Sequence, residues 1–250
     1  MVSFALTAQK AIVTGGSGGI GKAIVDALLE AGAEVCIIDL VECIEPRSEG
    51  LSALSSRTHF VKADLAKDKE IDRAFQEAVQ TLGGQLDILV NCAGINIKTP
   101  AEQVSLEDWE KVLQINVTAM FRMCQKAGQI MLPQEHGKII NIASICSFVG
   151  SQNNACYSTS KGAVAQLTKA LSNEWAPYGL QVNAIAPGTT LTKFTQNNSQ
   201  EMMQRILAHI PAGRLGKPED MQGPVVFFAS HASDYVTGVV LPVDGGYLCV

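Results

Sequence analysis

Tyr157 and Lys161 are a pair whose types and spacing could carry out acid–base chemistry. Residues four apart share one face of a helix, so the phenol and the ammonium would be neighbours. A free phenol, with a pKa of about 10, is a poor base at neutral pH. A nearby positive charge favours the phenolate and brings its pKa toward the range in which protons transfer readily. Because many helices carry such a pair for packing alone, the signal depends on what surrounds it. Ser144, at the end of an apolar run, could hydrogen-bond a reacting oxygen.

A glycine-rich turn supplies the second feature. The segment Thr14-Gly15-Gly16-Ser17-Gly18-Gly19-Ile20-Gly21 follows a short apolar run and precedes a helical pattern. Glycines let the backbone approach a pyrophosphate, and a helix N-terminus offers free N–H groups and the positive end of its dipole. Glycines also make ordinary tight turns. The position between the first strand and the first helix favours a dinucleotide site over a structural turn.

Asp39 ends the next apolar run, about 20 residues after the glycines, where a carboxylate can accept hydrogen bonds from ribose hydroxyls. The same charge would repel a 2′-phosphate. The glycine turn contains no Lys or Arg, and Leu40 follows the acid. The sequence therefore predicts NAD over NADP, with a solvated strand-end acid as the alternative.

Elements that could position these residues alternate along the whole chain. We expect strands at 10–14, 34–39, 59–63, 86–91, 138–143, 181–186 and 239–243. We expect helices at about 20–31, 67–82, 106–132, 157–176, 200–209 and 218–230. Apolar strands alternating with helices predict one α/β domain over residues 1–250, a doubly wound Rossmann fold whose seven-stranded parallel sheet has helices on both faces. The polar segment 189–200 is a lid candidate, and the substrate loop would run over about 189–210.

Composition narrows the class of protein. The 250 residues are 47% hydrophobic and 17% charged, as in a globular protein. A net charge of −5 without clustered Lys or Arg makes nucleic acid an unsuitable partner. Seven scattered Cys and four His show no metal-ligand spacing, which predicts reduced thiols and no metal site. No apolar run approaches the roughly 20 residues of a membrane helix, and no leader pattern is visible, so we expect a cytoplasmic protein without a membrane partner.

With these motifs in order, the chain resembles the short-chain dehydrogenase/reductase family over essentially its full length. Thr14, Gly15, Gly19 and Gly21 match the T-G-x-x-x-G-x-G turn, and Asn91-Cys92-Ala93-Gly94 matches N-x-A-G. Further matches to the family pattern are Asp64, Asn116, Ser144, Tyr157 with Lys161, and Pro187-Gly188 with Thr192.

The resemblance implies a mechanism and a set of site residues. In oxidation, Tyr157 as phenolate takes the hydroxyl proton while hydride passes to the nicotinamide, and in reduction Tyr157 donates the proton. Lys161 would lower the phenol pKa and bind the nicotinamide ribose, Ser144 would position the reacting oxygen, and Asn116 would hold a relay water. The implied cofactor-binding residues are Gly15, Ser17, Gly19, Ile20, Gly21, Asp39, Asp64, Leu65, Asn91, Ala93, Gly94, Tyr157, Lys161, Pro187, Gly188, Thr190 and Thr192. The resemblance also implies a homotetramer in which the helices at 106–132 and 157–176 pack against symmetry mates.

The substrate is less sharply defined. Segments 92–100, 139–147 and 173–188 resemble the branch that acts on sugars and sugar acids, such as gluconate 5-dehydrogenases and 2-deoxy-gluconate 3-dehydrogenases. Candidate substrate residues are Asn96, Lys98, Ser144, Cys146, Asn154, Tyr157 and Lys193. Asn153 stands where that branch tends to carry an Arg, so carboxylate recognition would rest on Lys98 or Lys193. A neutral sugar or polyol remains open. Asp39 and the absence of a base in the glycine turn argue against an NADP-dependent ketoacyl reductase, and the intact set of Asn116, Ser144, Tyr157 and Lys161 argues against a binding protein without catalysis.

Overall fold

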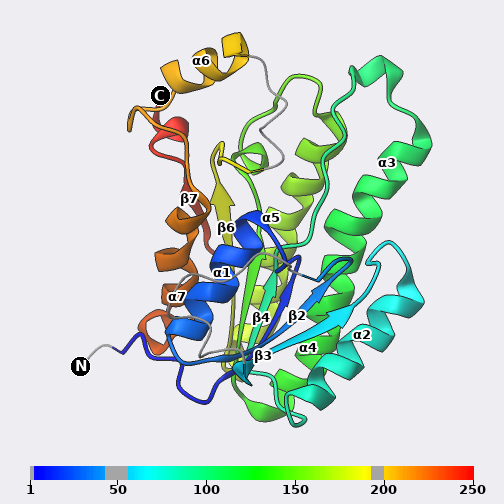
Figure 1. The fold of residues 1–250 in the computed structure, drawn as a ribbon, viewed down its shortest axis with the longest axis vertical. Helices are drawn as coiled ribbons and strands as arrows, with labels where there is room; N and C mark the ends of the chain where they lie inside the picture. The colour runs from blue at the N-terminus through cyan, green and yellow to red at the C-terminus, as the bar shows by residue number, and fades with distance from the viewer. Residues whose placement is uncertain (1–2, 43–55, 193–199) are drawn as a thin grey trace.

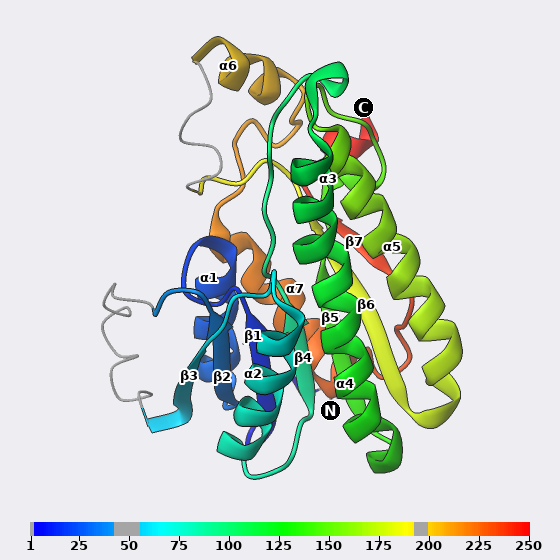
Figure 2. The same cartoon turned by 90° about the vertical axis from the view of Figure 1, so that its right-hand side faces the viewer.

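A seven-stranded, all-parallel sheet forms the centre of the protein in the computed structural model, which describes residues 3–42, 56–192 and 200–250 (Figure 1). The strand order is β3-β2-β1-β4-β5-β6-β7, and β3 to β6 follow one another from left to right in Figure 2. The strands are β1 (Lys10–Thr14), β2 (Glu34–Asp39), β3 (Thr58–Lys62), β4 (Ile88–Asn91), β5 (Gly137–Ile142), β6 (Leu180–Pro187) and β7 (Val240–Val243). The fold class predicted from the sequence is confirmed, and each strand lies within two residues of its expected bounds.

The strand order reverses between β1 and β4, because β2 and β3 extend from one side of β1 while β4 to β7 extend from the other. In open parallel sheets, ligands bind in the crevice that this reversal leaves at the carboxyl ends of the strands. The glycine turn follows β1, and Ser144 follows β5, so both lie at this edge.

Helices cover the sheet on both faces, which explains why most strands read as continuous apolar runs. One face carries α1 (Gly19–Glu30) and α7 (Gln222–Ala229), and the other carries α2 (Asp68–Thr81), α4 (Met120–Gln134) and α5 (Ala155–Trp175). Each face has its own hydrophobic core. Beneath α1 and α7 the core includes Ile24, Leu28 and Phe228, and beneath α2, α4 and α5 it includes Ile71, Phe75 and Met123.

The long helix expected at 106–132 is interrupted. The structure has α3 (Leu106–Leu113), a π-helical segment Gln114–Ala119, and then α4. The expected helix at 218–230 divides into a 3₁₀ turn, Pro218–Met221, and α7. The expected helix at 200–209 is α6 (Gln200–Ala208), while most of the lid candidate at 189–200 lies outside the described residues. The sequence shows one continuous helical pattern over 106–132, and this pattern does not reveal the π-helical segment around Asn116.

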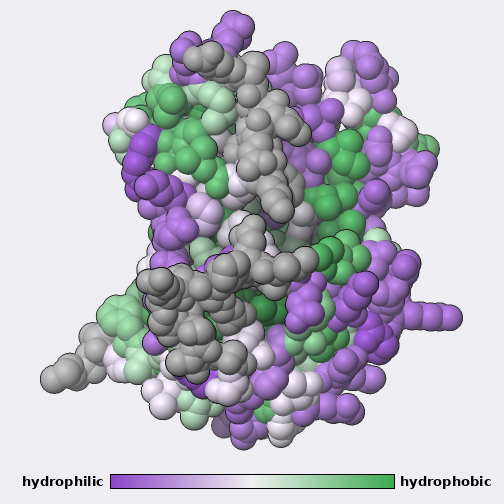
Figure 3. Space-filling model, in the orientation of Figure 1, coloured by the Kyte–Doolittle hydropathy of each residue, from purple (hydrophilic) through white to green (hydrophobic). Residues whose placement is uncertain are grey.

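Polar side chains cover the right-hand rim of the molecule over α2 and α3 in the view of Figure 3, and hydrophobic patches lie nearer its centre. No helix within the described ranges is long and apolar enough to cross a membrane.

Candidate active site

The glycine turn after β1 is held against the segment that follows β4. Gly15 has a positive φ of 68°, and a Cβ there would stand 2.7 Å from the Cα of Ala93. Only glycine permits both this conformation and this close approach. The hydroxyl oxygen of Thr14 accepts hydrogen bonds from the backbone N–H groups of Cys92 (3.1 Å) and Ala93 (3.2 Å). The two predicted cofactor segments are thus joined into one wall of the crevice.

Asp39 lies beside the glycine turn, as the sequence predicted. Its carboxylate accepts hydrogen bonds from the backbone N–H groups of Ser17 (3.0 Å) and Leu40 (2.7 Å). The charge therefore sits at the mouth of the turn. Gly18, on the same turn, has no neighbour within 4 Å of an added Cβ among the described residues, so the backbone there is open to a ligand.

The residues expected to do chemistry meet at the carboxyl end of β5. Ser144 directly precedes a 3₁₀ turn, Ile145–Ser147, and its hydroxyl oxygen accepts the backbone N–H of Cys146 at 3.1 Å. Lys161 on α5 lies with its Nζ 5.6 Å from the ring centre of Tyr157, and it donates to the carbonyl oxygen of Ile142 at 2.7 Å. Tyr157, Ser144 and Lys161 therefore form one cluster between β5 and α5.

Burial controls the titration of this cluster. It raises the pKa of the Tyr157 phenol to about 12, while a hydrogen bond with Ser144 acts in the opposite direction. It lowers the pKa of the Lys161 ammonium to about 8. The thiols of Cys92 and Cys146 act on both groups in the direction that raises the pKa. Desolvation is the largest influence on the pKa of the Tyr157 phenol, and Lys161 Nζ lies 5.6 Å from the centre of its ring.

Asn116 occupies the π-helical segment with no exposed surface. Its Oδ1 accepts the N–H of Ile95 at 2.8 Å, and its Nδ2 donates to the carbonyl of Ile95 at 2.9 Å and to Ser160 Oγ at 3.0 Å. The side chain therefore joins α5 to the segment after β4. Sequence reasoning placed Asn116 in the site but missed Ser160, whose only signal is its position beside Lys161.

Other predicted cofactor residues fall into two groups. Thr192 reaches the glycine turn, where a Cβ on Gly19 would stand 3.4 Å from its Cγ2, and Leu65 lines a small cavity with Thr14, Asn91 and Ala93. The side chains of Asn91 and Asp64, by contrast, are engaged elsewhere. The Asn91 amide donates to Asn141 and Cys124 in the core, and Asp64 accepts the N–H of Ala66 and pairs with Lys67. The remaining residues lie on the same edge of the sheet: Pro187 ends β6, and the segments after β1, β4 and β6 contain Ile20, Gly21, Gly94, Gly188 and Thr190.

The predicted substrate residues are partly brought together. Thr99 pairs with Asn154 in a β-bridge, so the segment containing Asn96 lies alongside the approach to α5. Asn154 is 7% exposed, and its Oδ1, like that of Asn96, has no hydrogen-bond partner among the described residues. Lys98 is exposed, and Lys193 lies outside the described residues.

A cavity of about 190 Å³ at the carboxyl ends of β6 and β7 was not foreseen. It is lined by Gly188, Thr189, Ala212, Arg214, Gly216, Asp220, Val243, Asp244 and Gly245. The Arg214 guanidinium is paired with Asp220 through two hydrogen bonds of 2.7 and 2.9 Å, so its charge is already balanced. Across 3–42, 56–192 and 200–250, no group of three His, Cys, Asp or Glu residues could hold a metal ion.

Known proteins are similar to this chain over nearly its whole length, in sequence and in fold. A family model described as enoyl-(acyl carrier protein) reductase matches residues 15–248. The 2-dehydro-3-deoxy-D-gluconate 5-dehydrogenase of Bacillus subtilis (strain 168) is 42% identical over 248 residues, covering 98% of this chain and 97% of that protein. The chain belongs to the short-chain dehydrogenase/reductase family. The gluconate 5-dehydrogenase of Gluconobacter oxydans (strain 621H) is 36% identical, covering 97% of this chain and 96% of that one.

A solved structure from Beutenbergia cavernae, described as an NAD(P) dependent gluconate 5-dehydrogenase with bound NADP at low occupancy, has a TM-score of 0.91 and 41% identity. The alignment covers 99% of both chains. This short-chain dehydrogenase/reductase is therefore an oxidoreductase whose Rossmann fold binds a nicotinamide dinucleotide. The open backbone at Gly18 and the wall formed by the glycine turn and the segment after β4 fit that ligand.

Proposed function

We propose that the protein is an NAD-dependent dehydrogenase that interconverts a secondary alcohol and a ketone on a sugar acid or a keto-deoxy sugar acid. The observation that carries the proposal is the cluster of Tyr157, Ser144 and Lys161 at the end of β5, beside the glycine turn. The nicotinamide supplies the hydride chemistry, and the chain supplies geometry, charge and a proton route.

In the proposed reaction, the Tyr157 phenolate accepts the proton of the reacting hydroxyl during oxidation, and the phenol donates a proton to the carbonyl oxygen during reduction. Ser144 holds the reacting oxygen by its hydroxyl. The Lys161 ammonium favours the phenolate, and Asn116 would hold a water that links Lys161 to solvent as a proton relay. Tyr157 is half-buried, so desolvation strengthens the effect of nearby charges and hydrogen bonds on its phenol. Residues proposed to hold the dinucleotide include Gly15, Gly19, Asp39, Ala93, Gly94 and Thr192.

Tyr157→Phe tests the acid–base assignment. Removing the hydroxyl leaves the ring packing in place, so we expect at least a hundredfold loss of kcat with NADH binding close to that of the unsubstituted enzyme. Steady-state kinetics and the fluorescence of bound NADH measure the two quantities. Full activity in this variant would remove Tyr157 from the mechanism.

The preference for NAD rests on Asp39. Its carboxylate already accepts the Ser17 N–H at the mouth of the turn, and a 2′-phosphate there would meet its negative charge. Bound NADP in the Beutenbergia cavernae structure is the reason to measure the preference directly. We expect kcat/KM to be at least tenfold higher with NAD than with NADP, and Asp39→Ala to reduce that ratio. A preference for NADP in the unsubstituted enzyme would contradict the proposal.

Support for a hydroxylated substrate comes from the relatives' names and from two amide oxygens. Asn96 Oδ1 and Asn154 Oδ1 are buried without partners in the described ranges, and unsatisfied buried acceptors favour a ligand that donates hydrogen bonds. A carboxylate on the substrate would be recognised by Lys98 or Lys193. The alternative is a neutral sugar or polyol, and an NADP-dependent ketoacyl reductase is disfavoured by Asp39.

A panel of sugars, polyols and aldonic and keto-deoxy aldonic acids with NAD separates these substrates. Turnover confined to acids supports the first proposal, turnover confined to neutral polyols supports the alternative, and no turnover with any member contradicts both.

We further propose a homotetramer in the cytoplasm, to be checked by light scattering and cell fractionation. The free cysteines in the described part of the chain agree with a reducing compartment.

A further inference from the structure

Ser147 joins the turn that carries Ser144 to helix α5. The turn, residues 144–149, follows β5, and the Ser147 backbone N–H donates to the Ser144 carbonyl oxygen at 2.8 Å. The Ser147 hydroxyl donates to the carbonyl oxygen of Lys161 on α5 at 2.6 Å. One residue therefore connects the backbone of Ser144 to the backbone of Lys161.

The contact with Lys161 adds to the hydrogen bonds of the helix and replaces none of them. A carbonyl oxygen has two lone pairs, and inside an α-helix one of them accepts the N–H four residues further along. Lys161 lies in the interior of α5 (Ala155–Trp175). Without the Ser147 hydroxyl, its carbonyl would keep this helical partner, so the fold would lose little while the turn would lose its link to the helix.

Few other polar contacts attach the turn to α5. Within the described ranges, its hydrogen bonds to that helix are the one from Ser147 and the one between the Ser144 hydroxyl and the Tyr157 phenol. Phe148 and Val149, at the end of the turn, are 51% and 41% exposed, so apolar burial holds that end weakly. The Ser147 contact is therefore the hydrogen bond to α5 that involves no reacting group.

The hydrogen bond between Ser144 and Tyr157 cannot hold the turn during the proposed reaction. The reacting oxygen has to lie within hydrogen-bonding distance of both hydroxyl groups, so it takes the place of their direct contact. At that stage the turn depends on Ser147 for its position relative to α5. Reacting groups must be held to within about 0.5 Å of their productive geometry, which makes this attachment important.

We propose that Ser147 is a positioning residue whose hydrogen bond to the Lys161 carbonyl sets the distance between the Ser144 hydroxyl and the Tyr157 phenol while the reacting oxygen lies between them. This role deepens the proposed function, on which it rests. Ser147 acts through Ser144 and makes no contact with the substrate.

A double-mutant cycle on kcat tests whether Ser147 acts through Ser144. Ser147→Ala should lower kcat about tenfold, because a small misplacement of a reacting group is costly. In the Ser144→Ala background the same substitution should lower kcat less than twofold, because no hydroxyl remains to be positioned. The KM for NAD should change less than twofold, since the glycine turn lies elsewhere in the crevice.

The pH profile of oxidation gives a second readout, and its sign follows from the Ser144 contact. Oxidation needs the phenolate, so kcat/KM rises with pH toward the pKa of Tyr157. The hydrogen bond with Ser144 lowers that pKa, so displacing Ser144 should raise the midpoint of the profile, by about half a pH unit in Ser147→Ala. The other titratable groups near Tyr157 are the same in both proteins: Lys161 on α5, Cys92 after β4 and Cys146 in the turn.

Thr168→Val is the matched control, because it also removes a hydroxyl that joins α5 to the β5 region. Thr168 has no exposed surface, and its Oγ1 accepts the Asn141 Nδ2 hydrogen at 3.0 Å. Its loss leaves a buried N–H without that acceptor, so Thr168→Val should destabilise the fold more than Ser147→Ala does. It should nevertheless keep kcat within about twofold and leave the pH midpoint unchanged, which separates positioning from a general loss of stability.

Hydrogen–deuterium exchange of peptides covering 144–149 tests the attachment without any substrate. The N–H groups of Cys146 and Ser147 are both bonded to Ser144, so they report on the turn. We expect several-fold faster exchange in Ser147→Ala and unchanged exchange in Thr168→Val. Ser147→Cys has a side chain of similar size and a weak donor, so it should shift exchange and kcat in the same direction if Ser147→Ala does not fold.

Two results would overturn the role of Ser147. One is exchange in the turn that stays the same in Ser147→Ala or Ser147→Cys. The other is an equal loss of kcat with and without the Ser144 hydroxyl. Because the exchange measurement needs no turnover, it tests Ser147 even if the unsubstituted enzyme fails on the whole substrate panel, an outcome that would refute the proposed function instead.

Discussion

Two buried lysines lie at opposite ends of strand β5, and they differ in what faces their charge. Lys138, the second residue of the strand, is 1% exposed and forms a 2.7 Å ion pair with Asp234. Lys161 is 4% exposed, and its Nζ donates to the carbonyl of Ile142, the last residue of the same strand. Burial lowers the pKa of both ammonium groups, and the hydrogen bond with Asp234 opposes this only for Lys138.

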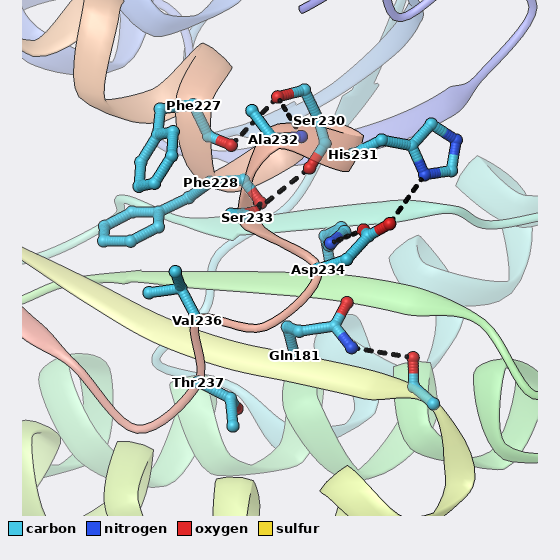
Figure 4. A network of polar contacts seen from close by, with 12 residues as sticks. Gln181, Phe227, Phe228, Ser230, His231, Ala232, Ser233, Asp234, Val236 and Thr237 are labelled. Atoms are coloured by element: carbon cyan, nitrogen blue, oxygen red, sulfur yellow. Dashed lines mark hydrogen bonds and ion pairs between the residues drawn. The ribbon is translucent and has the colours of Figure 1, made fainter. Parts of the chain in front are cut away.

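The difference distinguishes Lys138, whose charge forms a structural ion pair, from Lys161, whose charge is placed where it could take part in the reaction. At the amino end of β5, the Asp234 carboxylate is also turned toward His231, at 3.2 Å, within a group of serine–backbone contacts made by Ser230 and Ser233 (Figure 4). At the carboxyl end, the described part of the chain gives the ammonium of Lys161 a backbone carbonyl and no carboxylate partner. A buried ammonium without a counter-ion is costly to keep, and such groups cluster where chemistry is done.

Lys161→Met should have the largest effect. Loss of the ammonium removes the charge proposed to favour the Tyr157 phenolate, so we expect kcat to fall by about two to four orders of magnitude. Because an unpaired buried charge is replaced by an apolar side chain of similar length, the free energy of unfolding should stay the same or rise. Steady-state kinetics and denaturant unfolding measure the two quantities.

Lys138→Met is the matched control for that variant. It makes the same change at the opposite end of β5 and should keep kcat within about twofold, because Lys138 lies far from the reacting groups. Equal losses of kcat in the two variants would erase the distinction between the two ends of the strand.

Gly94→Ala changes the surroundings of Lys161 by a single methyl group. The added methyl group would approach Asn116 Oδ1 to 3.2 Å and Lys161 Nζ to 3.7 Å, and Gly94 has no positive φ to forbid alanine. We therefore expect a several-fold loss of kcat, with the unfolding free energy changed by less than about 1 kcal/mol.

Gly162→Ala provides the comparison for that methyl group. Gly162 lies on α5 directly after Lys161, and a Cβ there meets nothing within 4 Å among the described residues. Alanine should stabilise the helix by up to about 1 kcal/mol without lowering kcat. Unchanged kcat in Gly94→Ala would mean that the space between Asn116 and Lys161 takes no part in turnover.

The same comparison shows what the sequence could and could not reveal. Continuous apolar runs predicted the strands, and the glycine turn with Asp39 predicted one wall of the crevice, because these signals are local in the chain. The π-helical segment around Asn116 was not predicted, because the apolar residues keep an approximately helical spacing on both sides of it. The partners of Lys138 and Lys161 were also invisible, because Asp234 and Ile142 are distant in sequence and come together only through the sheet.

Asp234→Asn should have the smallest effect, and it acts on stability alone. It removes the counter-charge and leaves the Lys138 ammonium buried, which in a fully desolvated pair costs several kcal/mol. The Asp234 side chain is 57% exposed, so solvent screens the pair, and we expect a loss of only about 1 kcal/mol in the free energy of unfolding. Introducing Lys138→Met into the same variant should restore most of that loss, because no buried charge then remains. Denaturant unfolding of the single and double variants measures the coupling, and kcat should stay unchanged in both. A loss of turnover in Asp234→Asn would show that the amino end of β5 communicates with Lys161 at its other end.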